Sequence, residues 1–195
     1  MTGTVATTYQ RLEPRLRAAI PADVDYATVR FNESRSERLA VRSGVVQPPS
    51  TGIDAGVMIT VWAGGGVGYA ATSDLTDSGL ARAAGQATAW ARATAGRNVV
   101  GDLVPTEAPV GSYTSPVVES WDDTSLADRL ELLQEADAAM AVSDTIVDRL
   151  ATMRRIDTDS LILTTGGGRI EQLSRTTIPY AYATANSGTR TQTRS

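Results

Sequence analysis

The chain has 195 residues, a formal net charge of −4, no His and no Cys, and all 18 of its basic residues are Arg. Without His, Cys and Lys, the sequence excludes a Ser-His-Asp or Cys-His nucleophile, a zinc site of the usual nitrogen and sulfur ligands, and the lysine chemistry of Schiff bases and P-loops. Hydrophobic residues make up 42% of the chain, enough for a sizeable core in one domain or two small ones.

The acidic balance also limits the partners and the compartment. A net charge of −4 argues against a general attraction to nucleic acid or to an anionic membrane. No stretch approaches the roughly 20 apolar residues that span a bilayer, and the N-terminus shows no basic region followed by an apolar one. We therefore expect a cytoplasmic protein with no nucleic-acid partner and no membrane partner.

The first half of the chain has the pattern of a helix, an antiparallel meander and a second helix. Apolar residues recur at helical spacing at first, interrupted by Pro14, and then alternate with polar residues. The second helix is rich in Ala, with caps at Asp74–Asp77 and an end at Gly96. The predicted elements are a helix over residues 5–20, strands over 27–31, 39–41, 45–46, 57–62 and 68–72, and the Ala-rich helix to residue 91.

The second half begins with a connector over residues 98–123, where turn-forming residues recur and where the best domain boundary lies. A capping box at Ser125–Asp128 opens the next helix. Its predicted elements are a helix over 126–140 and strands over 146–156, 160–165, 169–175 and 177–185. The division is therefore 1–97, the connector 98–123, and 124–195, and the fold class is α+β, with helices packed on mainly antiparallel sheets.

Two glycine-rich stretches share letters with nucleotide-binding loops. Residues 66–71 satisfy G-x-G-x-x-A, but a short strand follows them and no acidic residue stands about 20 positions on. Residues 166–168 lack the Lys of a P-loop. We interpret both stretches as parts of hairpins.

The acidic residues of the second half are candidates for binding a hard cation or for carboxylate catalysis. The candidates are Asp122, Asp123, Glu131, Glu135, Asp137, Asp144 and Asp148. The two residues Asp122 and Asp123 stand where a helix N-terminus favours negative charge, and the two glutamates lie on the solvent side of a leucine stripe. A structural role therefore explains most of the set better than chemistry does.

Four side chains are candidates for contact with a partner or a peptide. Arg38 and Arg42 project from the strand face opposite Leu39 and Val41, and Arg30 lies on a neighbouring segment. Together they could form a surface for anions or carboxylates, although solvated arginines on an outer sheet face are the commoner explanation. Trp62, on the outward face of its strand, is either a packing anchor or the mark of a partner surface.

Several segments in order and at matching spacing resemble the N-terminal region of the TldD/PmbA family. The likeness continues through the Ala-rich helix and, more loosely, through residues 161–185, so it covers nearly the whole chain but about half of a family member. Pro14 and Gly166–Gly168 depart from the family pattern. The segments that carry the resemblance are Asp25–Arg30, Glu37–Val41, Arg42–Val46, Gly56–Val61 and Gly68–Thr76.

The resemblance implies one composite N-terminal domain of a longer architecture, in a peptidase system that cleaves unfolded peptides or peptide precursors within a chamber enclosed by two related subunits. In the active subunit of such a system, an HExxxH helix and a later Cys, all in the C-terminal half, hold the zinc. This sequence has none of these residues, so no metal ligand or catalytic residue carries over. We expect no cofactor in this chain, with zinc implied only for a C-terminal half.

Two hypotheses follow. In the first, the chain is the N-terminal domain of a TldD/PmbA-type metallopeptidase, as a truncated copy or as one half of a split system. It would then be inactive alone and would contribute chamber wall, contacts with a TldD/PmbA-type subunit or C-terminal half, and strand edges that pair with an extended peptide. In the second, it is a stand-alone, non-catalytic module that binds a peptide or a protein on the same scaffold.

Overall fold

The computed structural model describes residues 3–97 and 108–195, so the first part of the predicted connector lies outside the described residues. The helices are α1 (Gly3–Ala18), α2 (Asp77–Ala93) and α3 (Leu126–Ala139), with short 3-10 turns η1 (Trp121–Asp123) and η2 (Thr165–Gly167). All three helices agree with the sequence prediction. The strands are β1 (Tyr26–Arg42), β2 (Val45–Val46), β3 (Ser50–Ala63), β4 (Gly66–Thr72), β5 (Val110–Thr114), β6 (Ile146–Thr164), β7 (Arg169–Ser187) and β8 (Arg190–Arg194).

The strands are longer than predicted, because pairs of expected strands are continuous. The expected strands 27–31 and 39–41 are both parts of β1, and the same merging gives β6 and β7. In β1, Phe31 and Leu39 are both buried and lie on the same face, since they are an even number of residues apart. The polar residues between them interrupt the apolar signal without ending the strand.

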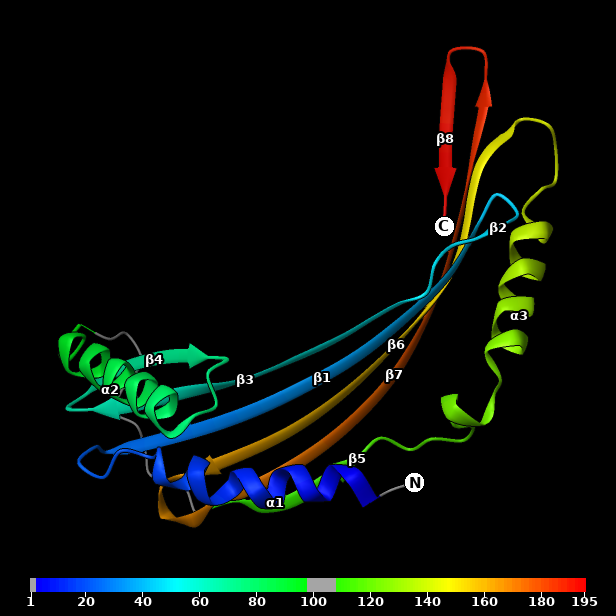
Figure 1. Ribbon diagram of the computed structural model, residues 1–195. Helices are drawn as coiled ribbons and strands as arrows, with labels where there is room; N and C mark the ends of the chain where they lie inside the picture. The colour runs from blue at the N-terminus through cyan, green and yellow to red at the C-terminus, as the bar shows by residue number, and fades with distance from the viewer. Residues whose placement is uncertain (1–2, 98–107) are drawn as a thin grey trace. The chain divides into compact units, whose positions relative to one another are not determined.

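The described strands form one eight-stranded sheet in the order β4-β3-β1-β6-β7-β5, with β2 paired to β1 and β8 paired to β7 (Figure 1). The α+β class and the mainly antiparallel pairing are confirmed. One exception is β5, which runs parallel to β7 within the expected connector. The C-terminal residues, for which the sequence pattern predicts no element, form β8 in a hairpin with β7.

The contacts of the chain divide it into two compact units, each assembled from three segments. Unit 1 comprises residues 1–34, 54–114 and 158–173, and unit 2 comprises residues 35–53, 115–157 and 174–195. The predicted division at residues 98–123 follows the order of the chain, whereas β1, β3, β6 and β7 each supply residues to both units.

Unit 1 is built on a large apolar core. One face of β1, β3 and β6 packs against buried side chains of α1 and α2, among them Leu16 and Leu80. The buried strand residues are Ala27, Val29, Phe31, Val57, Ile59, Val61, Leu161 and Leu163. Because side chains alternate along a strand, the opposite face of these strands carries the intervening residues and is not part of this core.

Helix α2 lies directly on β4 (Figure 1). A Cβ atom on Gly66 would clash with the carbonyl oxygen of Ala91, and one on Gly68 would clash with the backbone of Ala87 and Ala91. These two glycines therefore permit the close approach of helix and strand. Thr76 caps the helix by accepting a hydrogen bond from the backbone N–H of Gly79.

Unit 2 has a smaller apolar core, formed by Leu39, Val41, Leu133 and Ala151. Helix α3 covers it, and the predicted capping box is present: the Ser125 hydroxyl accepts from the Asp128 N–H, and the Asp128 carboxylate accepts from the Ser125 N–H. Half-buried Trp121 and Met153 pack against the edge of this core.

No helix among the described residues is long and apolar enough to cross a membrane.

Candidate functional site

The main concave feature near a predicted contact residue is a groove of about 780 Å³ in unit 1. It contains Arg30, which the sequence singles out as a contact residue. The groove crosses β1, β3, the end of β4 and β6. Its lining residues are Arg30, Asn32, Ser34, Asp54, Ala55, Gly56, Val57, Met58, Ala71, Thr72, Ser73 and Thr158.

Arg30 is the cationic group of this groove. Its side chain is exposed, and its Nε donates to Oδ1 of Asn32 at 3.3 Å. The same Asn32 oxygen accepts a hydrogen bond of 2.6 Å from the hydroxyl of buried Ser160. Because the Ser160 hydroxyl holds the side-chain amide of Asn32 in place, Asn32 in turn positions Nε of Arg30.

The floor of the groove is made of small residues where β4 ends. The β3–β4 ladder stops at the pair Val57 and Thr72, so residues 54–56 of β3 extend beyond the last β4 partner. A Cβ atom on Gly56 would lie 3.1 Å from the carbonyl oxygen of Thr72. Gly56, which has no side chain, thus belongs to the part of β3 that has no β4 partner.

Trp62 lies elsewhere in unit 1 and does not line the groove. It is half-buried, and its ring packs against Tyr26 with the centroids 5.3 Å apart. Both residues are on strand positions that alternate with the core residues of β1 and β3. The packing role explains this contact, and a partner role for Trp62 stays a prediction.

Arg38 and Arg42 belong to unit 2, whereas Arg30 belongs to unit 1. Arg42 makes a two-pronged ion pair with Asp148, from Nε to Oδ1 at 2.9 Å and from Nη2 to Oδ2 at 3.0 Å. Hydrogen bonding to Arg42 lowers the pKa of Asp148, and the Tyr182 hydroxyl also donates to that carboxylate at 3.1 Å. Arg42 is therefore already paired, whereas Arg38 is exposed.

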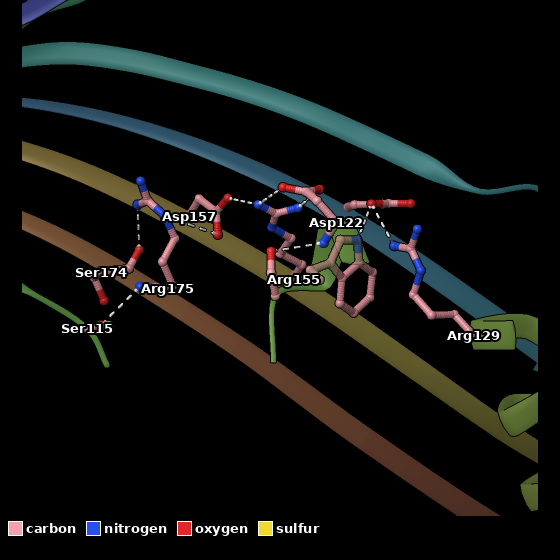
Figure 2. A network of polar contacts seen from close by, with 10 residues as sticks. Ser115, Asp122, Arg129, Arg155, Asp157, Ser174 and Arg175 are labelled. Atoms are coloured by element: carbon pink, nitrogen blue, oxygen red, sulfur yellow. Dashed lines mark hydrogen bonds and ion pairs between the residues drawn. The ribbon is translucent and has the colours of Figure 1, made fainter. Parts of the chain in front are cut away.

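A second polar cluster in unit 2 is centred on Arg155 (Figure 2). Its guanidinium bonds Asp122 at 2.7 and 3.3 Å and Asp157 at 2.6 Å. Burial alone would lower the pKa of Arg155, but the hydrogen bonds that it donates to these two carboxylates raise the pKa above its usual value. Asp157 also lies 3.9 Å from Nε of Arg175.

The cluster extends to the region that leads into α3. The indole N–H of Trp121 donates to Glu37 at 2.7 Å, and Arg129 lies over the Trp121 ring at 4.4 Å from its centroid. At the other end, the backbone N–H of Arg175 donates to the Ser115 hydroxyl at 3.1 Å (Figure 2). These contacts attach η1 and the start of α3 to the strands of unit 2, which is a structural role.

Three of the seven candidate acidic residues have identified partners. Asp122 and Asp148 pair with Arg155 and Arg42, as described above. Asp137, almost completely buried, accepts from the backbone N–H of Gly44 at 2.8 Å and from Nε of Arg149 at 3.0 Å.

Among the residues whose placement is described, no group of three His, Cys, Asp or Glu side chains could hold a metal ion. With no His or Cys in the sequence, the residues present do not fit the zinc site that the family resemblance implies.

The two glycine-rich stretches are confirmed as hairpin parts. Residues 64 and 65 form the tight turn with positive φ of 58° and 75°, and residues 66–71 continue as strand β4. Gly166 and Gly167 likewise have positive φ between β6 and β7. Neither stretch leads into a helix N-terminus.

Sequence reasoning found Arg30 but missed the rest of its groove. Asn32 and Ser34 share the face of β1 with Arg30, because they follow it at intervals of two residues. The alternation of these polar residues along one strand was the sequence signal that could have identified Asn32 and Ser34 as neighbours of Arg30. The contribution of Thr158 gives no such local signal, since it comes from a strand more than 100 residues away.

The comparisons with known proteins agree with the resemblance. Residues 27–91 match the family described as PmbA/TldA metallopeptidase domain 1. No curated protein matches the chain in sequence.

Three solved structures share the fold. A proposed modulator of a DNA gyrase from Thermotoga maritima has 15% identity and a TM-score of 0.62, covering 95% of this chain and 42% of that one. Another proposed modulator of DNA gyrase, from Bacteroides thetaiotaomicron, has 14% identity and a TM-score of 0.68, covering 95% of this chain and 43% of that one. TldE from Thermococcus kodakarensis has 14% identity and a TM-score of 0.57, with coverages of 95% and 40%.

The chain thus spans about two fifths of the length of the solved structures that it matches. At these identities the structural likeness concerns the fold, and the family model adds a sequence match from β1 to the greater part of α2. The resemblance noted in the sequence is confirmed as a likeness: residues 27–91 match the first domain of this family, and the fold is similar to that of solved structures that include TldE.

Proposed function

We propose that the chain serves as the non-catalytic N-terminal domain of a TldD/PmbA-type zinc metallopeptidase system and binds extended peptides or peptide precursors for proteolysis. The observation that carries this proposal is the match of residues 27–91 to the first domain of the metallopeptidase family. That segment contains most of the lining of the unit 1 groove, including Arg30, Gly56 and Thr72.

The side chains present indicate which tasks of the proposed system this domain performs and which belong to another part. The sequence lacks His and Cys, so the zinc and its ligands belong to another part of the system. What this domain supplies is backbone and surface: strand edges, the groove, and chamber wall. An extended peptide adds to such an edge through main-chain hydrogen bonds, which require no particular peptide sequence.

Exposed apolar side chains of unit 2 support contacts with another subunit or with a C-terminal half. Val118 is 100% exposed, Val142 77% and Ile53 73%. A small core that leaves large apolar side chains in solvent is stabilised when a partner covers them. Unit 1 also exposes large apolar side chains, among them Val110 at 79% and Tyr69 at 70%, so both units offer apolar surface for the subunit contacts of the proposed system.

The test is a peptidase assay with a quenched fluorescent peptide and added zinc. We expect no cleavage by the chain alone, and stable association with a family subunit that contains the HExxxH helix. Chelator-sensitive cleavage by the isolated chain would contradict the proposal. A chain that binds the peptide but ignores such a subunit would instead show a stand-alone binding module.

A further inference from the structure

We infer that the unit 1 groove is a carboxylate-binding subsite, in which Arg30 receives a carboxylate of an extended peptide. The inference deepens the proposed function and rests on its peptide binding. It names the chemical group that the domain prefers, whereas strand pairing alone would accept any peptide.

The first support is the state of the Arg30 side chain. A guanidinium has five N–H donors in a planar fork that matches the two oxygens of a carboxylate. Arg30 uses Nε for the amide oxygen of Asn32 and forms no ion pair with any described side chain. Its terminal N–H groups therefore keep their donor capacity for a ligand.

Other arginines near cavities differ from Arg30 in this respect. Arg15 lines a second groove in unit 1, but its Nε is paired with Asp77 at 2.6 Å. Arg92 lines a cavity together with Asp23 and Asp25, whose carboxylates disfavour a second anion there. The groove at Arg30 has one acidic lining residue, Asp54, against two in the cavity at Arg92, and its arginine forms no ion pair with any described side chain.

The surroundings of Arg30 favour a single carboxylate over a polyanion. The groove supplies one arginine and several hydroxyl groups, including those of Ser34, Ser73 and Thr158. A nucleic acid or polyphosphate would need a cluster of cations, which the groove lacks and which the net charge of −4 opposes. A peptide carries an isolated carboxylate at its C-terminus or on an Asp or Glu side chain.

The strand edge next to Arg30 suits the rest of such a peptide. Residues 54–56 of β3 lie in the groove and have no neighbour on β4. An extended peptide that pairs there would lie beside Asp54 and Ala55, because the carbonyl of Thr72 fills the space next to Gly56. Asp54, the acidic lining residue, would repel the carboxylate and so limits how far along β3 it can bind.

The experiment compares three peptides that share one uncharged eight-residue sequence and carry the same fluorophore of zero net charge, which has no carboxylate. The first ends in a free carboxylate, the second in an amide, and the third in an amide with one central Glu. Binding to the full chain is measured by fluorescence anisotropy at low salt. We expect at least one of the two carboxylate peptides to bind about tenfold more tightly than the neutral one, which is the size of a charge-assisted hydrogen bond.

Three variants make the result specific. Arg30→Gln should abolish the preference, Arg30→Lys should keep part of it, and Asp54→Asn should increase affinity for the carboxylate peptide. Arg38→Gln is the matched control, because it removes an exposed arginine from the same strand within unit 2. Circular dichroism confirms that each variant is folded.

The outcomes separate the two proposals. If the C-terminal carboxylate alone confers preference, the groove binds a peptide end, and if the Glu does, it binds an acidic side chain. Equal affinity for all three peptides, unchanged by Arg30→Gln, would overturn the subsite and leave peptide binding standing. No binding of any peptide would overturn both.

Discussion

Different interactions stabilise the interior of unit 1 and the interior of unit 2. In unit 1, two helices and one sheet face bury a continuous set of large apolar side chains, including Leu16, Phe31 and Ile59. In unit 2, a small core around Leu133 is supplemented by an ion pair in which Asp137 is 2% exposed, whereas ion pairs of unit 1, such as Arg15 with Asp77, are more exposed. Apolar burial is non-directional, whereas a buried ion pair depends on both partners. Unit 1 should therefore respond mainly to lost volume, and unit 2 mainly to lost charge partners.

The largest expected effect is loss of volume in unit 1. Phe31 is 1% exposed, and Phe31→Ala should lower the free energy of unfolding by about 3–5 kcal/mol, because it leaves a cavity in a packed core. Leu133→Ala in unit 2 should cost about 2 kcal/mol, since its half-buried neighbours can relax. Urea unfolding monitored by hydrogen exchange in each unit measures the free energy of unfolding of both variants. Equal costs would contradict the comparison.

The next effect is loss of a charge partner in unit 2. Arg149→Met leaves the carboxylate of Asp137, 2% exposed, without its cation and should cost about 3 kcal/mol. The matched control is Arg42→Met, which breaks the more exposed pair with Asp148 and should have no measurable effect on unfolding. The urea midpoints of the two variants are compared. An Arg149→Met variant as stable as the Arg42→Met control would refute a stabilising role of the Arg149–Asp137 pair.

A smaller effect tests the contact between α2 and β4 in unit 1. Gly68→Ala places a methyl group against the backbone of α2 and should cost about 1–3 kcal/mol by overpacking. Gly85→Ala is its control in the same helix, because its Cβ would meet no atom within 4 Å. That substitution should stabilise the chain by up to about 1 kcal/mol. Thermal unfolding would show opposite shifts, and shifts of one sign would argue against close packing at Gly68.

The smallest effect is a pH dependence in unit 2. Hydrogen bonding to Arg155 lowers the pKa of Asp122 in the folded chain. Its contribution to stability is therefore complete above the ordinary Asp pKa of about 3.9 and is lost as pH falls through the lowered value. Asp122→Asn should flatten this part of the stability curve below about pH 4. A variant whose curve keeps the full slope would place the titrating group elsewhere.

Local patterns were sufficient for the helices and for the class of the sheet. Helical spacing, caps and two-residue alternation depend on neighbours in the chain, and the capping box at Ser125 is a direct example. The lengths of the strands were not predictable in this way, because the polar residues between Phe31 and Leu39 gave no apolar signal while the backbone remained paired.

The candidate site shows the same limit. Three arginines on β1 follow one pattern, yet Arg42 is neutralised by a residue 106 positions away and Arg30 is not. Which arginine remains available depends on tertiary partners, and no local rule provides them. The sequence therefore singled out three arginines, which share strand β1, without distinguishing the member that lines a groove.

The most direct test of the central claim is hydrogen exchange of the full chain with and without the peptide that carries a free C-terminal carboxylate. If the peptide binds at the unit 1 groove, protection should appear at residues 30–34, 54–58 and 71–73, and Arg30→Gln should reduce it. Protection confined to the segments around Arg38 and Arg42 in unit 2, or no change anywhere, would contradict the account.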